Sequence, residues 1–179
     1  MKNHIELHSR LFVLNSYFRS HYSFIALEHY YYELDKDLGG LHPFTHMHNV
    51  LLCDAVTSWC KLFGSDKDEG HWKKAIPEVN HEKFREFLLT STNLTLDEFS
   101  DYRQKMINFR NKWVVHHDGN YEHDPVPFFD IAHDSAVALH TYIRENADES
   151  IVYDGPECIV SFGKEVSNAL ISRLILPKT

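Results

Sequence analysis

The chain has 179 residues, of which 43% are hydrophobic and 25% are charged, and its formal net charge is −8. This composition excludes a globally disordered chain, and no apolar run reaches the roughly 18 residues that a membrane-spanning helix needs. The acidic balance argues against a broad basic surface for duplex DNA, because affinity for phosphates comes mostly from lysine and arginine.

Hydrophobic residues recur at helical intervals along nearly the whole chain, whereas glycine and proline are few. Residues 66–77 are predicted to form a charged loop with at most one short turn, at 71–74. The pattern therefore predicts an all-α bundle of five or six helices. The predicted helices cover about 6–38, 45–63, 81–89, 95–117 and 128–146, and a sixth starts at 154–157.

The apolar stripe of each longer helix identifies the side chains that we expect in the core. They are Leu11, Leu14, Phe18, Ile25 and Tyr32 of the first helix, Leu52, Ala55, Val56, Trp59, Leu62 and Phe63 of the second, Phe99, Tyr102, Met106, Phe109 and Trp113 of the fourth, Ala132, Ala136, Leu139 and Ile143 of the fifth, and Ile159, Phe162, Val166 and Leu170 of the sixth.

The fourth helix has the clearest start signal. Thr95 and Glu98 have the spacing of a capping box, in which each side chain bonds the other residue's backbone N–H. Asn80 is a candidate N-cap for the helix before it. The fourth helix is predicted to end near His117, because Asp118 and Gly119 favour a turn.

The whole chain is expected to form one domain, over residues 1–179, because a chain of this length can build one substantial core. The three cysteines, Cys53, Cys60 and Cys158, have no disulfide-framework spacing, and the first residues have no leader pattern. These features predict reduced thiols and a cytoplasmic location. No cofactor-binding motif is present, so no cofactor is expected.

Residues suited to phosphodiester chemistry gather near the end of the fourth helix. Arg110 offers a bidentate donor to a phosphate, and His116 and His117 titrate near neutral pH. At about 100° per residue, an ideal helix places His117 roughly 20° from Arg110 and His116 about 120° away. The same residues have a simpler interpretation, because an arginine and a histidine at a helix C-terminus also complement the helix dipole.

The run F-R-N-K-x-x-x-H at 109–116 resembles the signature of the HEPN superfamily of all-α domains. That signature is an arginine, usually followed by a polar residue, and then a histidine after four to six intervening positions. Arg110 is separated by five residues from His116 and by six from His117. The Arg-Asn-Lys form is most similar to the abortive-infection branch, and the resemblance covers roughly 45–118.

The resemblance implies a metal-independent endoribonuclease in which the signature helices of two protomers flank a cleft. Arg110 would hold the scissile phosphate, and His116 would act as general base or acid while the RNA 2′-hydroxyl attacks. Asn111 would orient one of these groups. Family spacing favours His116 and ideal helix geometry favours His117, so both stay candidates. A toxic or phage-defence role, with an antitoxin as partner, is also implied.

Two alternatives remain open. A domain of this fold could serve as a non-catalytic dimeric binding or scaffold module. A histidine-rich bundle could instead bind zinc or nickel, since 14 histidines include His46, His48, His71 and His81. His46 and His48 would point about 200° apart on a helix, which makes them a poor chelating pair.

Overall fold

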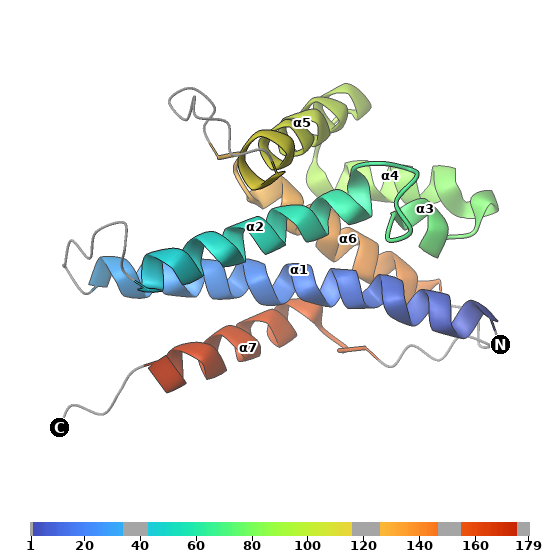
Figure 1. Ribbon diagram of the computed structural model, residues 1–179. Helices are drawn as coiled ribbons and strands as arrows, with labels where there is room; N and C mark the ends of the chain where they lie inside the picture. Colours follow the sequence, from blue (N-terminus) through green and yellow to red (C-terminus); the bar gives the residue numbers. More distant parts are fainter. Residues whose placement is uncertain (1, 34–42, 116–125, 147–154, 175–179) are drawn as a thin grey trace. The chain divides into compact units, whose positions relative to one another are not determined.

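The computed structural model describes residues 2–33, 43–115, 126–146 and 155–174, and within these ranges it contains helices and no strand. The predicted all-α class is confirmed, and the expected short turn at 71–74 is a four-residue helix. The elements (Figure 1) are α1 (Lys2–Glu33), α2 (Pro43–Phe63), α3 (Trp72–Ala75), η1 (Glu78–Asn80), α4 (His81–Thr92), α5 (Leu96–Phe109), η2 (Arg110–Val115), α6 (Asp130–Glu145) and α7 (Ile159–Leu174).

Internal contacts divide the chain into two compact units. Residues 1–14 and 56–155 form the first unit, and residues 15–55 and 156–179 form the second. The boundary passes within α1 and within α2, so neither helix belongs to one unit alone. A single domain over 1–179 stays a prediction.

Trp59 is a fully buried residue of the first unit's core. Its indole N–H donates a hydrogen bond to Ser135 Oγ on α6 over 2.9 Å. Its ring stacks on Phe63 at 5.2 Å and meets the edge of Tyr102 at 5.6 Å. The Tyr102 hydroxyl in turn donates to the Phe128 carbonyl. A buried tryptophan with its polar atom satisfied thus joins α2 to α5 and α6.

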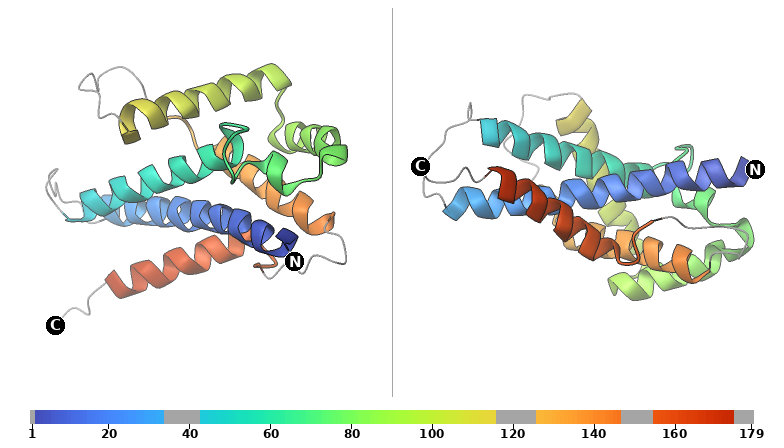
Figure 2. Two further views of the ribbon diagram at one scale, coloured as in Figure 1. Left: turned by 45° about the vertical axis from the view of Figure 1, so that its right-hand side comes forward. Right: turned by 90° about the horizontal axis from the view of Figure 1, so that it is seen from below.

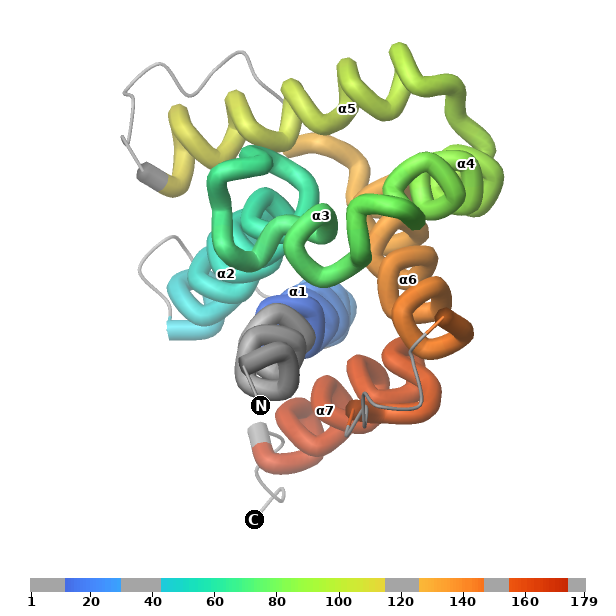
Figure 3. Tube along the Cα trace, turned by 90° about the vertical axis from the view of Figure 1, so that its right-hand side faces the viewer, coloured from blue at the N-terminus to red at the C-terminus, as the bar shows by residue number. Residues whose placement is uncertain are grey.

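Helices α4 and α6 pack side by side in the same unit (Figure 3). Phe84 of α4 is fully buried, with its ring 5.2 Å from Tyr142 of α6 and 4.8 Å from Trp72 of α3. These aromatic contacts fix α3 and α4 against the core.

The ends of α4 and α5 follow local sequence signals. Asn93 ends α4 in the left-handed conformation, with φ 53°, and its N–H reaches the carbonyls of Leu89 and Thr90. The capping box at the start of α5 is confirmed: Glu98 N–H donates to Thr95 Oγ1, and Thr95 N–H donates to Glu98 Oε2. The Asn80 side chain makes no capping bond, because the 3₁₀ turn η1 leads directly into α4.

In the second unit, α7 crosses the part of α1 that follows residue 14 (Figure 2). The approach is close, because a Cβ added at Gly163 would lie 2.3 Å from the Tyr22 ring. Arg19 lies over the Phe162 ring at 5.2 Å. Helix α7 starts at Ile159, later than the predicted start at 154–157, of which residue 154 lies outside the described residues.

The expected core residues of α2, α6 and the α5 stripe up to Phe109 are all buried. Ile25 is the clear error, because 43% of its surface is exposed. In α1 the buried positions, which include Ser20, His21 and Ser23, are spread around most of the helix circumference. A single apolar stripe could not identify them, and the side chains of Leu11 and Tyr32 lie outside the described residues.

None of the helices in the described ranges is both long and apolar enough to span a bilayer.

Candidate functional site

The helix that carries the candidate catalytic residues changes its winding at Arg110. Residues Arg110–Val115 form a π-helix, η2, directly after α5. The Arg110 N–H is shared between the carbonyls of Met106 and Ile107, a bifurcated bond that is common where an α-helix ends. Single π-helical turns inside α-helices are rare and occur frequently at functional sites.

Cys60 of α2 contacts the ladder at that point. Its thiol donates to the Met106 carbonyl over 3.7 Å, so this oxygen takes a second donor besides the Arg110 N–H. Burial raises the pKa of the Cys60 thiol to about 11, while the nearby Arg110 charge acts in the opposite direction. The thiol therefore stays protonated and can donate this hydrogen bond.

Arg110 is held by its neighbour. Its Nε–H and one Nη2–H both donate to the Asn111 side-chain oxygen, over 3.2 and 2.9 Å. Arg110 is half-buried, whereas Asn111 and Lys112 are exposed. Trp113 stacks on the buried Phe109 with ring centroids 5.6 Å apart. The guanidinium is thus oriented at the surface of a segment that is anchored by an aromatic pair.

His116 and His117 lie outside the described residues. The expectation that His117 lies about 20° from Arg110 assumed α-helical rotation per residue. A π-helix closes its bonds from residue i to i+5 and turns less at each residue, so that premise does not hold from Arg110 to Val115. Ideal helix geometry therefore no longer favours His117 over His116.

The histidines of the metal hypothesis have other surroundings. His48 stacks on Phe24 at 4.2 Å, and burial lowers its pKa. His81 Nε2 faces the carbonyls of Lys73 and Ile76 at 3.1 and 2.9 Å. His46 is exposed. The described ranges contain no group of three or more histidine, cysteine or acidic residues placed to hold a metal ion.

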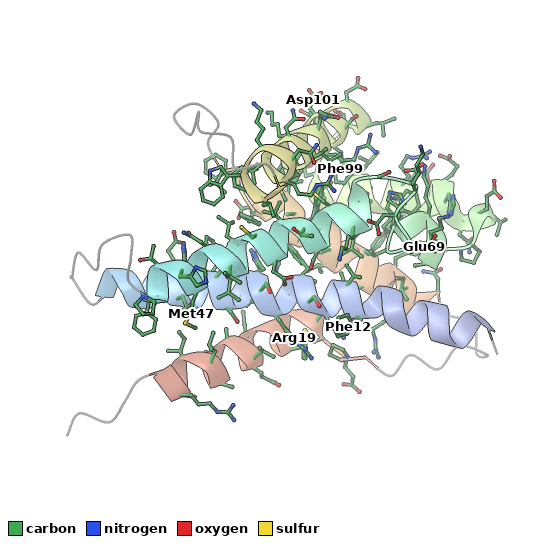
Figure 4. All side chains as sticks on the ribbon, viewed as in Figure 1. Phe12, Arg19, Met47, Glu69, Phe99 and Asp101 are labelled. Atoms are coloured by element: carbon green, nitrogen blue, oxygen red, sulfur yellow. The ribbon has the colours of Figure 1, made fainter. Side chains whose placement is uncertain are left out.

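A cleft of about 170 Å³ lies elsewhere in the first unit, between the segment after α2, α4 and the first half of α5. Phe99 and Asp101 lie on opposite sides of α5 (Figure 4), and it is the Phe99 side that lines the cleft. Its lining combines apolar and charged side chains, namely Phe63, Asp66, His71, Trp72, Lys73, Arg85, Leu88, Leu89, Leu96, Phe99, Ser100 and Arg103.

His71 is the buried polar residue of this cleft, with 1% of its surface exposed. Its Nδ1 accepts from the Lys73 N–H and caps α3, so Nε2 carries the proton in the neutral ring. Nε2 has no hydrogen-bond partner, although Asp66 Oδ1 lies 3.4 Å away. Burial lowers the pKa of His71 to about 4, against the opposing effect of the Asp66 charge.

Of the charged side chains around His71, Asp66 and Lys73 are close to it in sequence, and Arg103 comes from α5. Asp66 forms an ion pair with Lys73 at 2.5 Å, and this bond lowers the pKa of the Asp66 carboxyl. Arg103 of α5 donates to the Gly64 carbonyl over 3.3 Å and lies close enough to affect the pKa of both Asp66 and His71. The loop that holds Asp66 and His71 is fixed by its own turn, since the Asp68 and His71 N–H groups donate to the Ser65 and Asp68 carbonyls.

The sequence predicted the residues at 110–117 as one site and missed the cleft. The available signal was the mixture of His71, Trp72 and charged residues in the 66–77 loop. Nothing in that loop indicated that Arg103, some thirty residues later, would join it. Comparisons of the chain with protein-family models, with curated proteins and with solved structures find no match.

Proposed function

We propose that the protein is a metal-independent endoribonuclease of the HEPN type that works as a homodimer. The observation that carries the proposal is the Arg110 guanidinium, held by two hydrogen bonds to Asn111 on a partly exposed π-helical turn. An arginine so oriented is suited to bind the oxygens of a phosphodiester. Lys112 adds an exposed cation beside it.

In the proposed reaction the RNA 2′-oxygen attacks the adjacent phosphorus. A histidine, His116 or His117, takes the proton of the 2′-hydroxyl, and the bond from phosphorus to the 5′-oxygen breaks. The leaving 5′-oxygen receives a proton from a protonated histidine, which the partner protomer supplies. Arg110 stabilises the negative charge that develops on the phosphorane oxygens. The products are a 2′,3′-cyclic phosphate and a 5′-hydroxyl.

The homodimer supplies the second set of groups. Each η2 segment would face its copy across a two-fold axis, which places an Arg110 and a histidine from each protomer in one cleft. The proposed setting is the cytoplasm, where a toxic or phage-defence nuclease would meet cellular RNA and be held in check by an antitoxin.

The test is RNA cleavage by the purified protein in EDTA. The wild type is expected to cut single-stranded RNA and leave cyclic phosphate ends, whereas Arg110→Ala and His116→Ala are expected to lose at least about 100-fold in rate. Lys105→Ala is the matched control, since Lys105 is an exposed cation on the preceding α5. Cleavage that needs a divalent metal, or that Arg110→Ala retains, contradicts the proposal.

The net charge of −8 favours a second candidate, a non-catalytic dimeric binding module of the same fold, because an acidic chain repels RNA. This candidate predicts a dimer that cleaves no RNA under any condition. Sedimentation of the wild type together with the cleavage assay separates the two: a dimer without cleavage supports the module, and a dimer that cleaves supports the nuclease.

A further inference from the structure

The cleft between the 64–71 loop, α4 and α5 has a volume and an apolar lining suited to a small molecule. A cavity of about 150 Å³ is enough to hold benzene, and this cleft measures about 170 Å³. Phe63, Leu88 and Phe99 are buried in its wall, and Leu96 lies at its edge with 55% of its surface exposed. An apolar body of six to ten or so non-hydrogen atoms therefore fits.

The charge of the cleft is opposite in sign to that of the chain. Three cationic side chains and one carboxylate line it, in a protein of net charge −8. Asp66 is neutralised by Lys73, and Arg85 pairs with the exposed Glu82. Within the described residues Arg103 forms no ion pair, and one of its five N–H donors is used on the Gly64 carbonyl. Arg103 is thus the cation that is placed to take an anionic ligand.

His71 supplies a second donor. Its Nε2–H is buried in the cleft without a hydrogen-bond partner, and leaving a buried donor unsatisfied costs free energy. Asp66 Oδ1 lies 3.4 Å from Nε2 and does not form a hydrogen bond with it. An acceptor on a ligand would remove this cost, because the ring is held in position by its Nδ1 bond to the Lys73 N–H.

We propose that this cleft binds a small organic anion, with its phosphate or carboxylate group on Arg103 and His71 Nε2 and its apolar body against Phe99 and Leu88. The cleft is a binding site and not a second catalytic centre. The lone pair of His71 Nδ1 already accepts from the Lys73 N–H, and Nε2 carries the proton, so the neutral ring has no free base to offer.

Calorimetric titration with four probes tests the proposal. Phenyl phosphate and benzoate carry both features, benzyl alcohol lacks the charge, and inorganic phosphate lacks the apolar body. We expect at least one of the two aromatic acids to bind with a Kd of about 1 mM or tighter, and benzyl alcohol and phosphate to bind at least tenfold more weakly. Preference for phenyl phosphate identifies a phosphate ester as the ligand class, and preference for benzoate identifies a carboxylate.

Variants then locate the bound acid. Arg103→Gln is expected to weaken binding at least tenfold, and Arg103→Lys, which keeps the charge but not the fork, by less. His71→Asn keeps an acceptor for the Lys73 N–H and removes Nε2, so we expect several-fold weaker binding with α3 still capped. Lys105→Gln, on the same helix but outside the cleft, should bind as the wild type does.

Thermal melting confirms that each variant is folded before its affinity is compared. The proposal is overturned if neither aromatic acid binds at 10 mM or so, if benzyl alcohol binds equally well, or if a folded Arg103→Gln binds with unchanged affinity.

Discussion

Two candidate sites lie along α5 and the η2 segment that continues it, and they differ in how the chain builds them. In η2, Arg110 and Asn111 are neighbours in sequence, and each determines the position of the other. In the middle of α5, Arg103 meets His71 and Asp66 only because a loop after α2 folds against the helix. The first site can therefore be recognised in the sequence as a motif, whereas the second forms only when the chain folds.

The two candidate sites also differ in how far their residues are exposed to solvent. Asn111 and Lys112 are exposed, as the proposed contact with RNA requires. His71 is buried, and its cleft is only large enough for a small molecule. The two candidate sites share no residue.

The largest expected effect is a reciprocal loss of function. Arg110→Ala should lower RNA cleavage by about 100-fold or more and leave the binding of phenyl phosphate or benzoate unchanged. Arg103→Gln should weaken the binding of these aromatic acids at least tenfold and leave RNA cleavage unchanged. Parallel cleavage assays and calorimetric titrations of the two variants measure this. If either variant impairs both activities while its melting curve is unchanged, the two sites are not independent.

The buried histidine should make stability depend on pH. The pKa of His71 is about 4 in the folded protein and about 6.5 when unfolded, so between these values the unfolded chain binds the extra proton. Stability from this group is complete above pH 6.5 or so and is lost as the pH falls toward 4, by about 3 kcal/mol in all.

His71→Asn isolates that contribution from the other titrating groups. Between pH 7.5 and 4.5 the free energy of unfolding of the wild type should fall by about 2 to 3 kcal/mol more than that of the variant. Urea denaturation at both pH values measures the difference. Asp66 contributes little to this difference in unfolding free energy, because its pKa is lowered further below this pH range in the folded protein. Parallel pH profiles for the two proteins would show that folding does not lower the pKa of His71.

A smaller effect is expected from the residue that orients Arg110. Asn111→Ala removes both hydrogen bonds to the guanidinium but leaves its charge, so cleavage should fall by about tenfold or less. The rate at saturating RNA, compared with that of Arg110→Ala, measures this. A loss as large as that of Arg110→Ala would assign Asn111 a direct role in the reaction and not a positioning role.

The smallest effect is expected at the start of α5. Thr95→Ala removes one half of the capping box and should destabilise the protein by about 1 kcal/mol. Because this change lies next to Leu96, which lines the cleft, it should weaken binding of the aromatic acids slightly and leave RNA cleavage unchanged. Chemical denaturation and the two assays check this prediction, and a change in RNA cleavage alone would argue against two independent sites.

Local signals in the sequence predicted much of this fold. The Thr95 and Glu98 capping box and the stripe from Phe99 to Phe109 placed α5 correctly, because both act within one or two turns of helix. Ile25 was assigned to the core and is exposed, since burial in α1 depends on which sides of the helix other segments cover. Local periodicity carries no such information.

For the candidate sites too, local sequence predicted some features and distant contacts determined the others. Spacing identified Arg110 and Asn111, yet it could not predict the π-helical turn, which coincides with a contact from Cys60, fifty residues earlier. The His71 cleft was missed altogether, because its charges come from three separate segments. The prediction that His116 or His117 completes the first site remains a prediction, and it falls on residues outside the described ranges.

The proposed nuclease activity is tested most directly by the chemistry of the RNA ends produced in EDTA. We expect the wild-type protein to leave 2′,3′-cyclic phosphate and 5′-hydroxyl ends, and Arg110→Ala, purified in the same way and equally folded, to leave none above background. Intact RNA after incubation with a folded wild-type dimer, or equal cleavage by Arg110→Ala, would contradict it.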